Sequence, residues 1–246
     1  MHVSQATDTD GQTYAQKGIV RNLSWTLSPH KLHGLMGRSG SGKTSLSLMF
    51  AGLLQPSRGH ILLLGQDWTN HPTLRQKRVI YMPQTPVLFN GTLFDNIVYN
   101  IPGWTPRAVH RLLQRHAIAN VFSSGVETES PKQKPGRASS QRHASFGEET
   151  YLHRDVGHLG QRLSGGQKQM VMLARTLVMI EARTKHAART NTPWLLILDE
   201  PTASLDAKNE RRLIAALHHL KARVTILVIT HSEQVARLCD SHRILA

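Results

Sequence analysis

A glycine-rich segment from Gly37 to Thr44 has the composition and spacing of a phosphate-binding loop. Its residues, Gly-Arg-Ser-Gly-Ser-Gly-Lys-Thr, follow an apolar run and precede a helical pattern. Small residues let consecutive backbone N–H groups surround a phosphate at a helix N-terminus. Lys43 would reach the β- and γ-phosphates, and the Thr44 hydroxyl would be a ligand of Mg²⁺. The residues expected to contact the nucleotide are Gly37, Arg38, Ser39, Gly40, Ser41, Gly42, Lys43, Thr44 and Ser45.

Two adjacent acids, Asp199 and Glu200, follow the apolar run Leu195 to Leu198. Carboxylates at the C-terminal tip of a buried strand lie where ligands bind in α/β proteins. Asp199 suits a partner of Mg²⁺, and Glu200 suits a residue that orients or polarises an attacking water. An ordinary strand end with exposed acids is the alternative, and the phosphate loop argues against it.

A second segment, Leu163-Ser164-Gly165-Gly166-Gln167, opens a long helical pattern. The Ser164 hydroxyl and the amides of the two glycines can present donors to a phosphate, with the helix dipole behind them. Ser-Gly-Gly is also a common helix start, in which the serine only caps the helix. Both roles are open for these residues taken alone.

The order of these motifs along the chain resembles that of the ATP-binding-cassette (ABC) ATPases, over nearly the whole sequence. The resemblance rests on the phosphate loop, Gln84, the Leu163–Gln167 signature, Asp199-Glu200, Asp206 and His231. It implies ATP and Mg²⁺ as cofactors, with Thr44, Gln84 and Asp199 on the metal.

The same resemblance assigns roles to residues outside the phosphate loop. Glu200, His231 and Gln84 would form the catalytic set, His231 contacting the γ-phosphate. Asp206 would lie in a loop that communicates between two sites, and Tyr14 would stack on adenine.

Family members act as head-to-tail pairs, so the resemblance implies a homo- or heterodimer in which one copy's phosphate loop meets the other's signature. The segment Leu88 to Ile97 is similar to an exporter segment that meets a membrane subunit, and Val156 to Gly160 resembles another exporter pattern. We therefore expect the ATP-hydrolysing domain of an exporter, held at the cytoplasmic face of a membrane by a transmembrane partner.

Three residues depart from the family pattern. His158 stands where a glutamate is usual, Met170 where an arginine is usual, and His30 where a turn glycine is common. His158 and Met170, together with the short ends of the chain, keep a hydrolysis-impaired regulatory domain as an alternative, against which the intact Glu200, Gln84 and His231 argue.

The elements that must position these residues alternate between strand and helix. Apolar runs predict strands at Leu32–Met36, His60–Leu64, Arg78–Met82, Trp194–Leu198 and Val224–Ile229, and periodicity predicts helices at Lys43 to about Leu54, Gly165 to about Ile180 and Lys208–Lys221. This alternation predicts an α/β fold with a mostly parallel sheet. We expect one domain, 1–246, in which the resemblance adds a helical subdomain at about 88–178, carrying the signature, and a small antiparallel β subdomain. The polar segments 123–150 and 181–192 are predicted to be disordered inserts.

The composition is strongly basic, with 30 Lys plus Arg against 16 Asp plus Glu and a formal charge of +14. This balance suits a nucleotide, a nucleic acid or an anionic lipid surface, but a solvated surface concentrated in the two polar segments is the favoured explanation. A soluble ABC ATPase acting on nucleic acid is the less favoured alternative, because no heptads separate Thr44 from Leu163. No apolar run reaches the roughly 20 residues of a membrane span. The N-terminus lacks a secretory pattern, and the lone Cys239 suits a reducing compartment.

Overall fold

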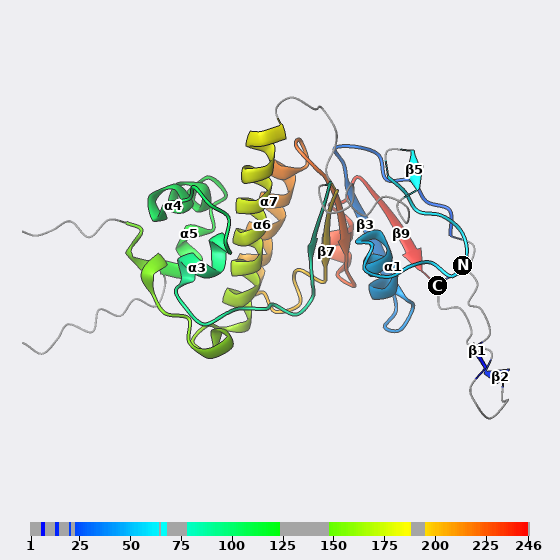
Figure 1. The fold of residues 1–246 in the computed structure, drawn as a ribbon, viewed down its shortest axis with the longest axis horizontal. Helices are drawn as coiled ribbons and strands as arrows, with labels where there is room; N and C mark the ends of the chain where they lie inside the picture. Colours follow the sequence, from blue (N-terminus) through cyan, green and yellow to red (C-terminus); the bar gives the residue numbers. More distant parts are fainter. Residues whose placement is uncertain are drawn as a thin grey trace, which may run out of the picture. The chain divides into compact units, whose positions relative to one another are not determined.

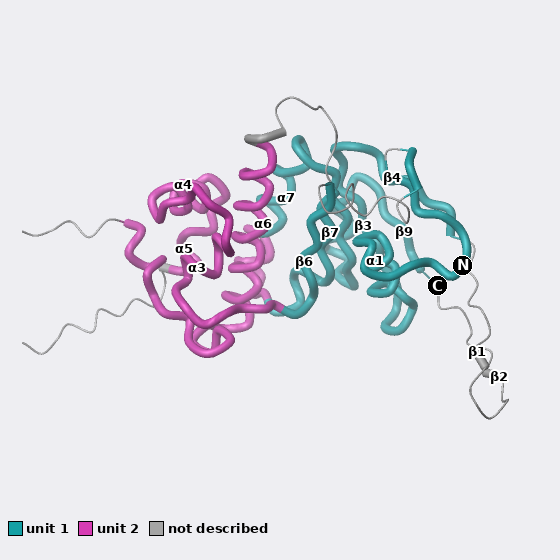
Figure 2. Tube along the Cα trace, viewed as in Figure 1, with its two compact units in different colours: residues 1–85, 189–204, 213–246 teal, residues 86–188, 205–212 magenta. Residues whose placement is uncertain are grey.

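The chain divides into two compact units, which Figure 2 shows in teal and magenta. Unit 1 contains residues 1–85, 189–204 and 213–246, and unit 2 contains residues 86–188 and 205–212. The computed structural model describes residues 6–7, 13–14, 20, 23–63, 65–67, 78–123, 148–187 and 195–245.

Unit 1 is built on a five-stranded parallel sheet, which confirms the predicted α/β class (Figure 1). The strands lie in the order β6 (Val79–Met82), β7 (Leu195–Asp199), β8 (Thr225–Ile229), β3 (Leu32–Gly37) and β9 (Ser241–Leu245). Asp199 pairs with Ile229, and Ile229 pairs with Leu35. The carboxyl ends of β7, β8 and β3 are therefore level at one edge of the sheet.

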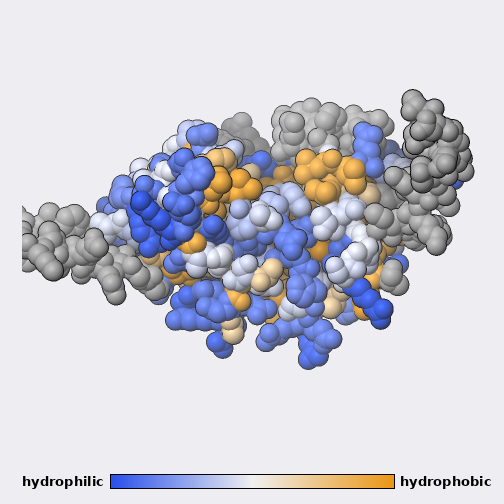
Figure 3. Space-filling view, turned by 90° about the horizontal axis from the view of Figure 1, so that it is seen from below, coloured by the Kyte–Doolittle hydropathy of each residue, from blue (hydrophilic) through white to orange (hydrophobic). Residues whose placement is uncertain are grey.

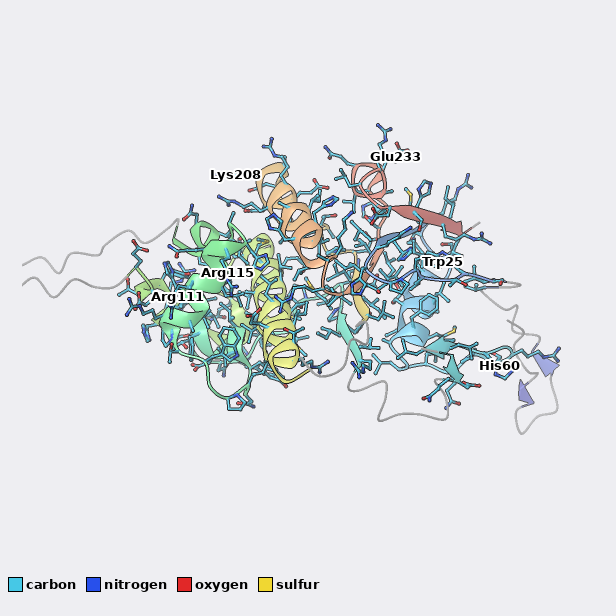
Figure 4. All side chains as sticks on the ribbon, turned by 90° about the horizontal axis from the view of Figure 1, so that it is seen from above. Trp25, His60, Arg111, Arg115, Lys208 and Glu233 are labelled. Carbon is cyan, nitrogen blue, oxygen red and sulfur yellow. The ribbon has the colours of Figure 1, made fainter. Side chains whose placement is uncertain are left out.

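The central strands of the sheet are buried on both faces, as strands of parallel sheets usually are. Every residue of β7 and β8 is buried. Helix α1 (Lys43–Phe50) packs against β3, β7 and β8. Trp25 packs edge-on against Phe50 of α1, and Figure 4 labels its position. The core on this side contains Val20, Leu35, Leu46, Ala51, Val79, Leu195, Ile197, Leu227, Ile229 and Leu245.

Two short antiparallel pairs accompany the parallel sheet. Strand β1 (Ala6–Thr7) pairs with β2 (Thr13–Tyr14), and β4 (Leu62–Leu63) pairs with β5 (Gln66–Asp67). The β4–β5 turn contains Gly65 at a φ of 77°, a conformation that glycine adopts without strain. The separate antiparallel pairing agrees with the expected β subdomain, although β4 is shorter than the predicted strand His60–Leu64.

Unit 2 is helical in the ranges that the structure describes. It contains α3 (Leu93–Val98), α4 (Pro106–Arg115), α5 (Ala119–Ser123), the 3₁₀ segments η2 (Thr150–His153) and η3 (His158–Gly160), and α6 (Gly165–Ala187). Helix α3 packs on α6 and η2. Across the described ranges, no helix combines the length and the hydropathy needed to cross a bilayer.

The helix starts in unit 2 follow ordinary capping chemistry. The Thr92 side chain accepts a hydrogen bond from Asp95 N, and the Asp95 side chain accepts one from Thr92 N, which forms a capping box. Thr105 caps α4, and Pro106 occupies its first turn, where a missing N–H costs nothing. The two threonine caps explain why α3 begins at Leu93 and α4 at Pro106.

The prediction of a disordered insert at 181–192 is wrong for residues 181–187, which continue α6. The Thr184 hydroxyl donates to Ile180 O, and the Glu181 carboxylate lies 3.9 Å from Arg115. The polar composition of residues 181–187 is therefore compatible with a regular helix, in which Glu181 pairs with Arg115 of α4. Residues 188–192 lie outside the described part.

The other predicted insert, 123–150, also includes folded residues at its ends. Ser123 closes α5, and Thr150 opens η2. Glu148 accepts one hydrogen bond from Gln114 and contacts His110. Residues 124–147 lie outside the described part, so their disorder stays a prediction.

Positive charge is also carried by regular structure. Arg111 and Arg115 project from α4, and Lys208 projects from α7 (Ala207–Leu220), as Figure 4 shows. The basic balance therefore does not belong to the polar segments alone.

Candidate active site

Four loops of unit 1 follow the carboxyl ends of parallel strands, and they carry the predicted phosphate loop and the three predicted catalytic residues. We call the edge of the sheet that these four loops form the carboxyl edge. Gly37 to Thr44 follow β3, Gln84 follows β6, Glu200 follows β7 and His231 follows β8. Parallel strands present these ends to the same side of the sheet, where α/β proteins bind ligands.

The phosphate loop depends on glycine at three positions. Gly37, Gly40 and Gly42 have φ values of 154°, 79° and 92°. A Cβ at Gly37 would lie 2.7 Å from Leu245 O, which is backbone and cannot move aside. Gly42 is the N-cap of α1, and no side chain caps this helix. The first N–H groups of α1 are therefore available to an anion.

Lys43 is turned back onto its own loop. Its Nζ donates to Gly37 O and to Arg38 O, both at 2.8 Å. The Ser41 hydroxyl is buried in the same loop without a hydrogen-bond partner. A phosphate would offer new acceptors to both groups, so this loop fits the triphosphate that the sequence predicts.

Asp199 ends β7 and is 1% exposed. Its Oδ2 accepts hydrogen bonds from Ser47 Oγ and Tyr81 Oη, each at 3.2 Å, whereas its Oδ1 is buried with no partner. Burial raises the pKa of Asp199, and the two hydrogen bonds and the charge of Lys43 oppose that shift. Burial also raises the pKa of Tyr81, so its hydroxyl keeps its proton at neutral pH.

Glu200 and His231 lie together, as the prediction of one catalytic set requires. His231 Nδ1 lies 2.8 Å from Glu200 Oε2, an ion-pair distance without the alignment of a hydrogen bond. Glu200 is 7% exposed, and its N–H donates to Ile229 O at 2.9 Å. Its φ of 47° is left-handed, a conformation that costs a non-glycine residue about 1–3 kcal/mol. The fold thus holds this carboxylate at the edge against a local strain.

For two other predicted residues, Gln84 and Tyr14, the structure gives a position in the chain but no side-chain contact within the site. Gln84 is exposed, two residues after Met82, which pairs with Leu198 beside the acids. Tyr14 lies in β2, but its side chain is outside the described part, so stacking on adenine stays a prediction.

The signature residues begin α6 in unit 2. Gln167 N donates to Ser164 Oγ, and Ser164 N donates to Gln167 Oε1, both at 3.1 Å. This is a reciprocal capping box, so the alternative of a serine cap is present in the structure. Ser164 and Gly165 are exposed and remain accessible to a ligand.

Asp206 caps α7 in a similar way. Its Oδ1 accepts a hydrogen bond from Asn209 N at 2.7 Å. The communicating role of Asp206 stays a prediction beside this cap.

Comparison with known proteins identifies the family. Residues 20–203, about three quarters of the chain, match the family model described as ABC transporter. The chain belongs to the ABC transporter family. It is an ABC-type ATPase domain that binds ATP, and its similarity to exporters agrees with the pattern in its sequence.

Two curated relatives and one solved structure show how far the similarity extends. The chain is 34% identical over 222 residues to the ATP-dependent lipid A-core flippase of Pseudomonas putida, covering 88% of this chain and 30% of the flippase. It is 31% identical over 232 residues to the mitochondrial potassium channel ATP-binding subunit of Pongo abelii, covering 92% of this chain and 27% of that protein. The solved structure of a bacterial Atm1-family ABC exporter with ATP bound aligns with a TM-score of 0.72 at 26% identity, covering all of this chain and 36% of that one. The ABC domain thus spans about a third or less of each protein. None of these similarities favours an ATPase that acts on nucleic acid.

The three departures from the family pattern fit their surroundings in this ABC domain. His158 is exposed, so its ring carries no burial cost, and Met170 is fully buried, as an apolar side chain should be. His30 has a φ of 57°, which explains why a glycine suits this turn. None of the three lies in the carboxyl edge.

Sequence reasoning missed three polar residues with defined partners. Tyr81 and Ser47 contact Asp199, and Arg175 donates to the carbonyl oxygens of Asn96 and Val87. Each interrupts an apolar pattern: Tyr81 in a strand, Ser47 on the inner face of α1 and Arg175 in the most apolar part of α6. A polar residue at a position that periodicity assigns to the core is the signal that could have found them.

Proposed function

We propose that this ABC domain hydrolyses ATP at its carboxyl edge and couples hydrolysis to export by a transmembrane partner. The observation that carries the proposal is the convergence of Gly37–Thr44, Asp199, Glu200 and His231 on one edge of one sheet. Glu200 orients or polarises the attacking water, and His231 holds the catalytic geometry near it. Lys43 leaves its loop carbonyls to contact the phosphates.

The polar groups at this edge suit a magnesium ion. The unpartnered Oδ1 of Asp199 is an oxygen of the kind that Mg²⁺ prefers, and the Thr44 hydroxyl and the Gln84 amide would supply two more. When bound, Mg²⁺ neutralises charge on the transferring phosphoryl group. The protein's part is to keep Asp199 dry and oriented and to expose Thr44 at the start of α1.

The active site is completed by a second ABC domain. The exposed Ser164 and Gly165 carry donors at a helix N-terminus and suit the phosphate of a nucleotide held by another copy. Either an identical or a related domain can supply them. The proposal therefore places the phosphate loop of one copy against the signature of the other.

An exposed apolar surface on unit 2 supports a membrane partner. It consists of Val87, Phe89, Tyr99 and Leu159, which are 51%, 43%, 47% and 60% exposed. Phe89 and Tyr99 stack with ring centroids 5.0 Å apart, and Leu159 N donates to the neighbouring Asn90. We call these four residues the aromatic patch. On the face seen in Figure 3, hydrophobic side chains likewise form separate patches among hydrophilic ones.

The guanidinium group of Arg175 contacts the two rings of the aromatic patch. Its guanidinium carbon lies 5.6 Å from the Phe89 ring centroid and 4.9 Å from that of Tyr99. It also donates to Val87 O at 3.1 Å. A buried cation in contact with both stacked rings restricts their orientation, which suits a docking surface for a membrane subunit. Docking there would place the ABC domain at the cytoplasmic face of the membrane.

Glu200→Gln tests the ATPase assignment. We expect the variant to bind ATP as the wild type does and to lose about 10²–10⁴-fold in turnover, the usual contribution of a general base. Nucleotide binding by calorimetry and phosphate release would be measured on the same preparation. Full turnover in the variant would remove Glu200 from the chemistry.

The membrane contact has its own test. In a cell extract, the double variant Phe89→Ser/Tyr99→Ser should stay in the supernatant under conditions in which the wild type sediments with membranes. Leu53→Ser is the matched control, because Leu53 is 64% exposed on unit 1. Equal sedimentation of all three proteins would refute docking through the aromatic patch.

A further inference from the structure

The two oxygens of the Asp199 carboxylate have different surroundings. Oδ2 receives both hydroxyls, from Tyr81 and Ser47, and Oδ1 receives neither. A carboxylate without such donors can rotate about χ2 and exchange its oxygens. The donors therefore decide which carboxylate oxygen is left without a hydrogen bond.

Tyr81 and Ser47 differ in how many acceptors their hydroxyl groups have. A serine hydroxyl has one proton, and Ser47 Oγ lies 2.8 Å from Thr44 O but 3.2 Å from Asp199 Oδ2. Ser47 therefore shares its proton between two acceptors. Tyr81 directs its phenol to Asp199 Oδ2.

These hydrogen bonds join three segments of unit 1. Tyr81 lies in β6, three residues before Gln84, and pairs with Ile197 of β7. Ser47 lies in α1, one turn after Thr44. The three residues proposed to bind Mg²⁺, namely Thr44, Gln84 and Asp199, thus belong to segments that meet through the Tyr81–Asp199–Ser47 contact.

We propose that Tyr81 is the positioning residue for the metal oxygen of Asp199, and that Ser47 assists it. By holding Oδ2, Tyr81 keeps Oδ1 free for Mg²⁺ and ties the β6 end to the acid strand. This inference rests on the proposed nucleotide site and adds a residue that does not itself touch nucleotide or metal.

Tyr81→Phe tests the proposal, because it removes the hydroxyl and keeps the ring. The measurement is the affinity for a non-hydrolysable ATP analogue, by calorimetry, once with Mg²⁺ and once with EDTA. We expect the gain in affinity that Mg²⁺ provides to fall about tenfold, near the lower end of what a hydrogen bond to a charged group contributes. The affinity in EDTA should stay unchanged. Ser47→Ala should reduce the gain by less than Tyr81→Phe does.

Two further variants calibrate the measurement. Asp199→Asn should remove most of the Mg²⁺-dependent gain. Tyr151→Phe makes the same chemical change at a buried phenol, which contacts His110 in unit 2, and should leave both affinities unchanged. Thermal melting of each variant shows that the fold is retained.

Two results would overturn the role of Tyr81. One is an unchanged Mg²⁺-dependent gain in Tyr81→Phe while Asp199→Asn loses it. The other is an equal loss of affinity with Mg²⁺ and with EDTA, which marks a merely structural hydroxyl. If the wild type itself binds no nucleotide, the proposed function fails before any variant is compared.

Discussion

The two helices that begin with proposed phosphate donors, α1 and α6, are capped in opposite ways. The N-cap of helix α1 is Gly42, a left-handed residue with no side-chain cap, and Lys43 folds back onto loop carbonyls. Helix α6 starts at Ser164, whose side chain and backbone exchange hydrogen bonds with Gln167. The first helix start is open and the second is closed.

This difference suggests separate roles for the two helices, namely nucleotide binding for α1 and completion of the site in a second copy for α6. An open N-terminus can take a phosphate without first breaking a cap, so we expect α1 to hold the nucleotide in a single copy. The closed start of α6 is stable alone, but the Ser164 hydroxyl still has a proton to donate, because in the box it only accepts. Helix α6 therefore suits a partner that arrives after the nucleotide.

The largest effect should come from removing the charge at the open helix. Lys43→Ala loses charge-assisted hydrogen bonds to the phosphates, and we expect ATP affinity to fall about 10- to 100-fold. Equilibrium binding of ATP measures this change. Lys208→Ala, an exposed lysine on α7, is the control. An unchanged affinity in Lys43→Ala would show that the open helix start is not the phosphate site.

A smaller effect should come from the closed helix. Ser164→Ala removes a cap and should destabilise the domain by about 1 kcal/mol, or a few degrees in melting temperature. Asp206→Ala removes the cap of α7 and should cost a similar amount, and denaturant unfolding measures both.

The two caps should differ in their effect on catalysis. Ser164→Ala should also lower ATP turnover at saturating ATP, because it removes a donor that completes the site. If both variants lose stability and Ser164→Ala keeps full turnover, the signature is a cap alone.

The smallest effect concerns acid stability of the sheet that carries the open helix. The hydrogen bond from Leu32 N, followed by that from Lys221, lowers the pKa of Asp240. A lowered pKa stabilises the fold at neutral pH, and the stabilisation is lost as the pH falls below about 4 and through the folded value. Asp240→Asn should therefore be less stable than the wild type at pH 7, with the difference shrinking toward pH 3.

Denaturant midpoints across pH would measure this dependence. Glu233→Gln, which breaks an exposed pair with Arg237, is the matched control. A difference between Asp240→Asn and the wild type that stays constant with pH would show that charge at Asp240 is not the cause.

Much of unit 1 follows directly from the sequence. Continuous apolar runs predict β3, β7 and β8 to within about a residue, because strands buried on both faces need no alternation. The same patterns place the phosphate loop and the two acids at strand ends. Strand β9 was not predicted, because four of its five residues are exposed and Ser241, His242 and Arg243 are polar.

The remaining features depend on contacts between distant residues. The end of α6 was missed because its residues are mostly polar, and the contact of Glu181 with Arg115 of α4 forms only in the folded unit. Likewise, no pattern in the sequence pairs Tyr81 with Asp199, 118 positions away. Motifs thus predict which residues carry chemistry, whereas tertiary contacts decide how those residues are held.

The most direct test of a site shared between two copies is the mass of the Glu200→Gln variant in solution, by light scattering, with and without MgATP. Because this variant should bind ATP without hydrolysing it, we predict a mass that doubles on addition of MgATP and returns to that of one chain when Ser164→Arg is added to block the signature. A Glu200→Gln protein that is saturated with ATP and stays monomeric would contradict the account.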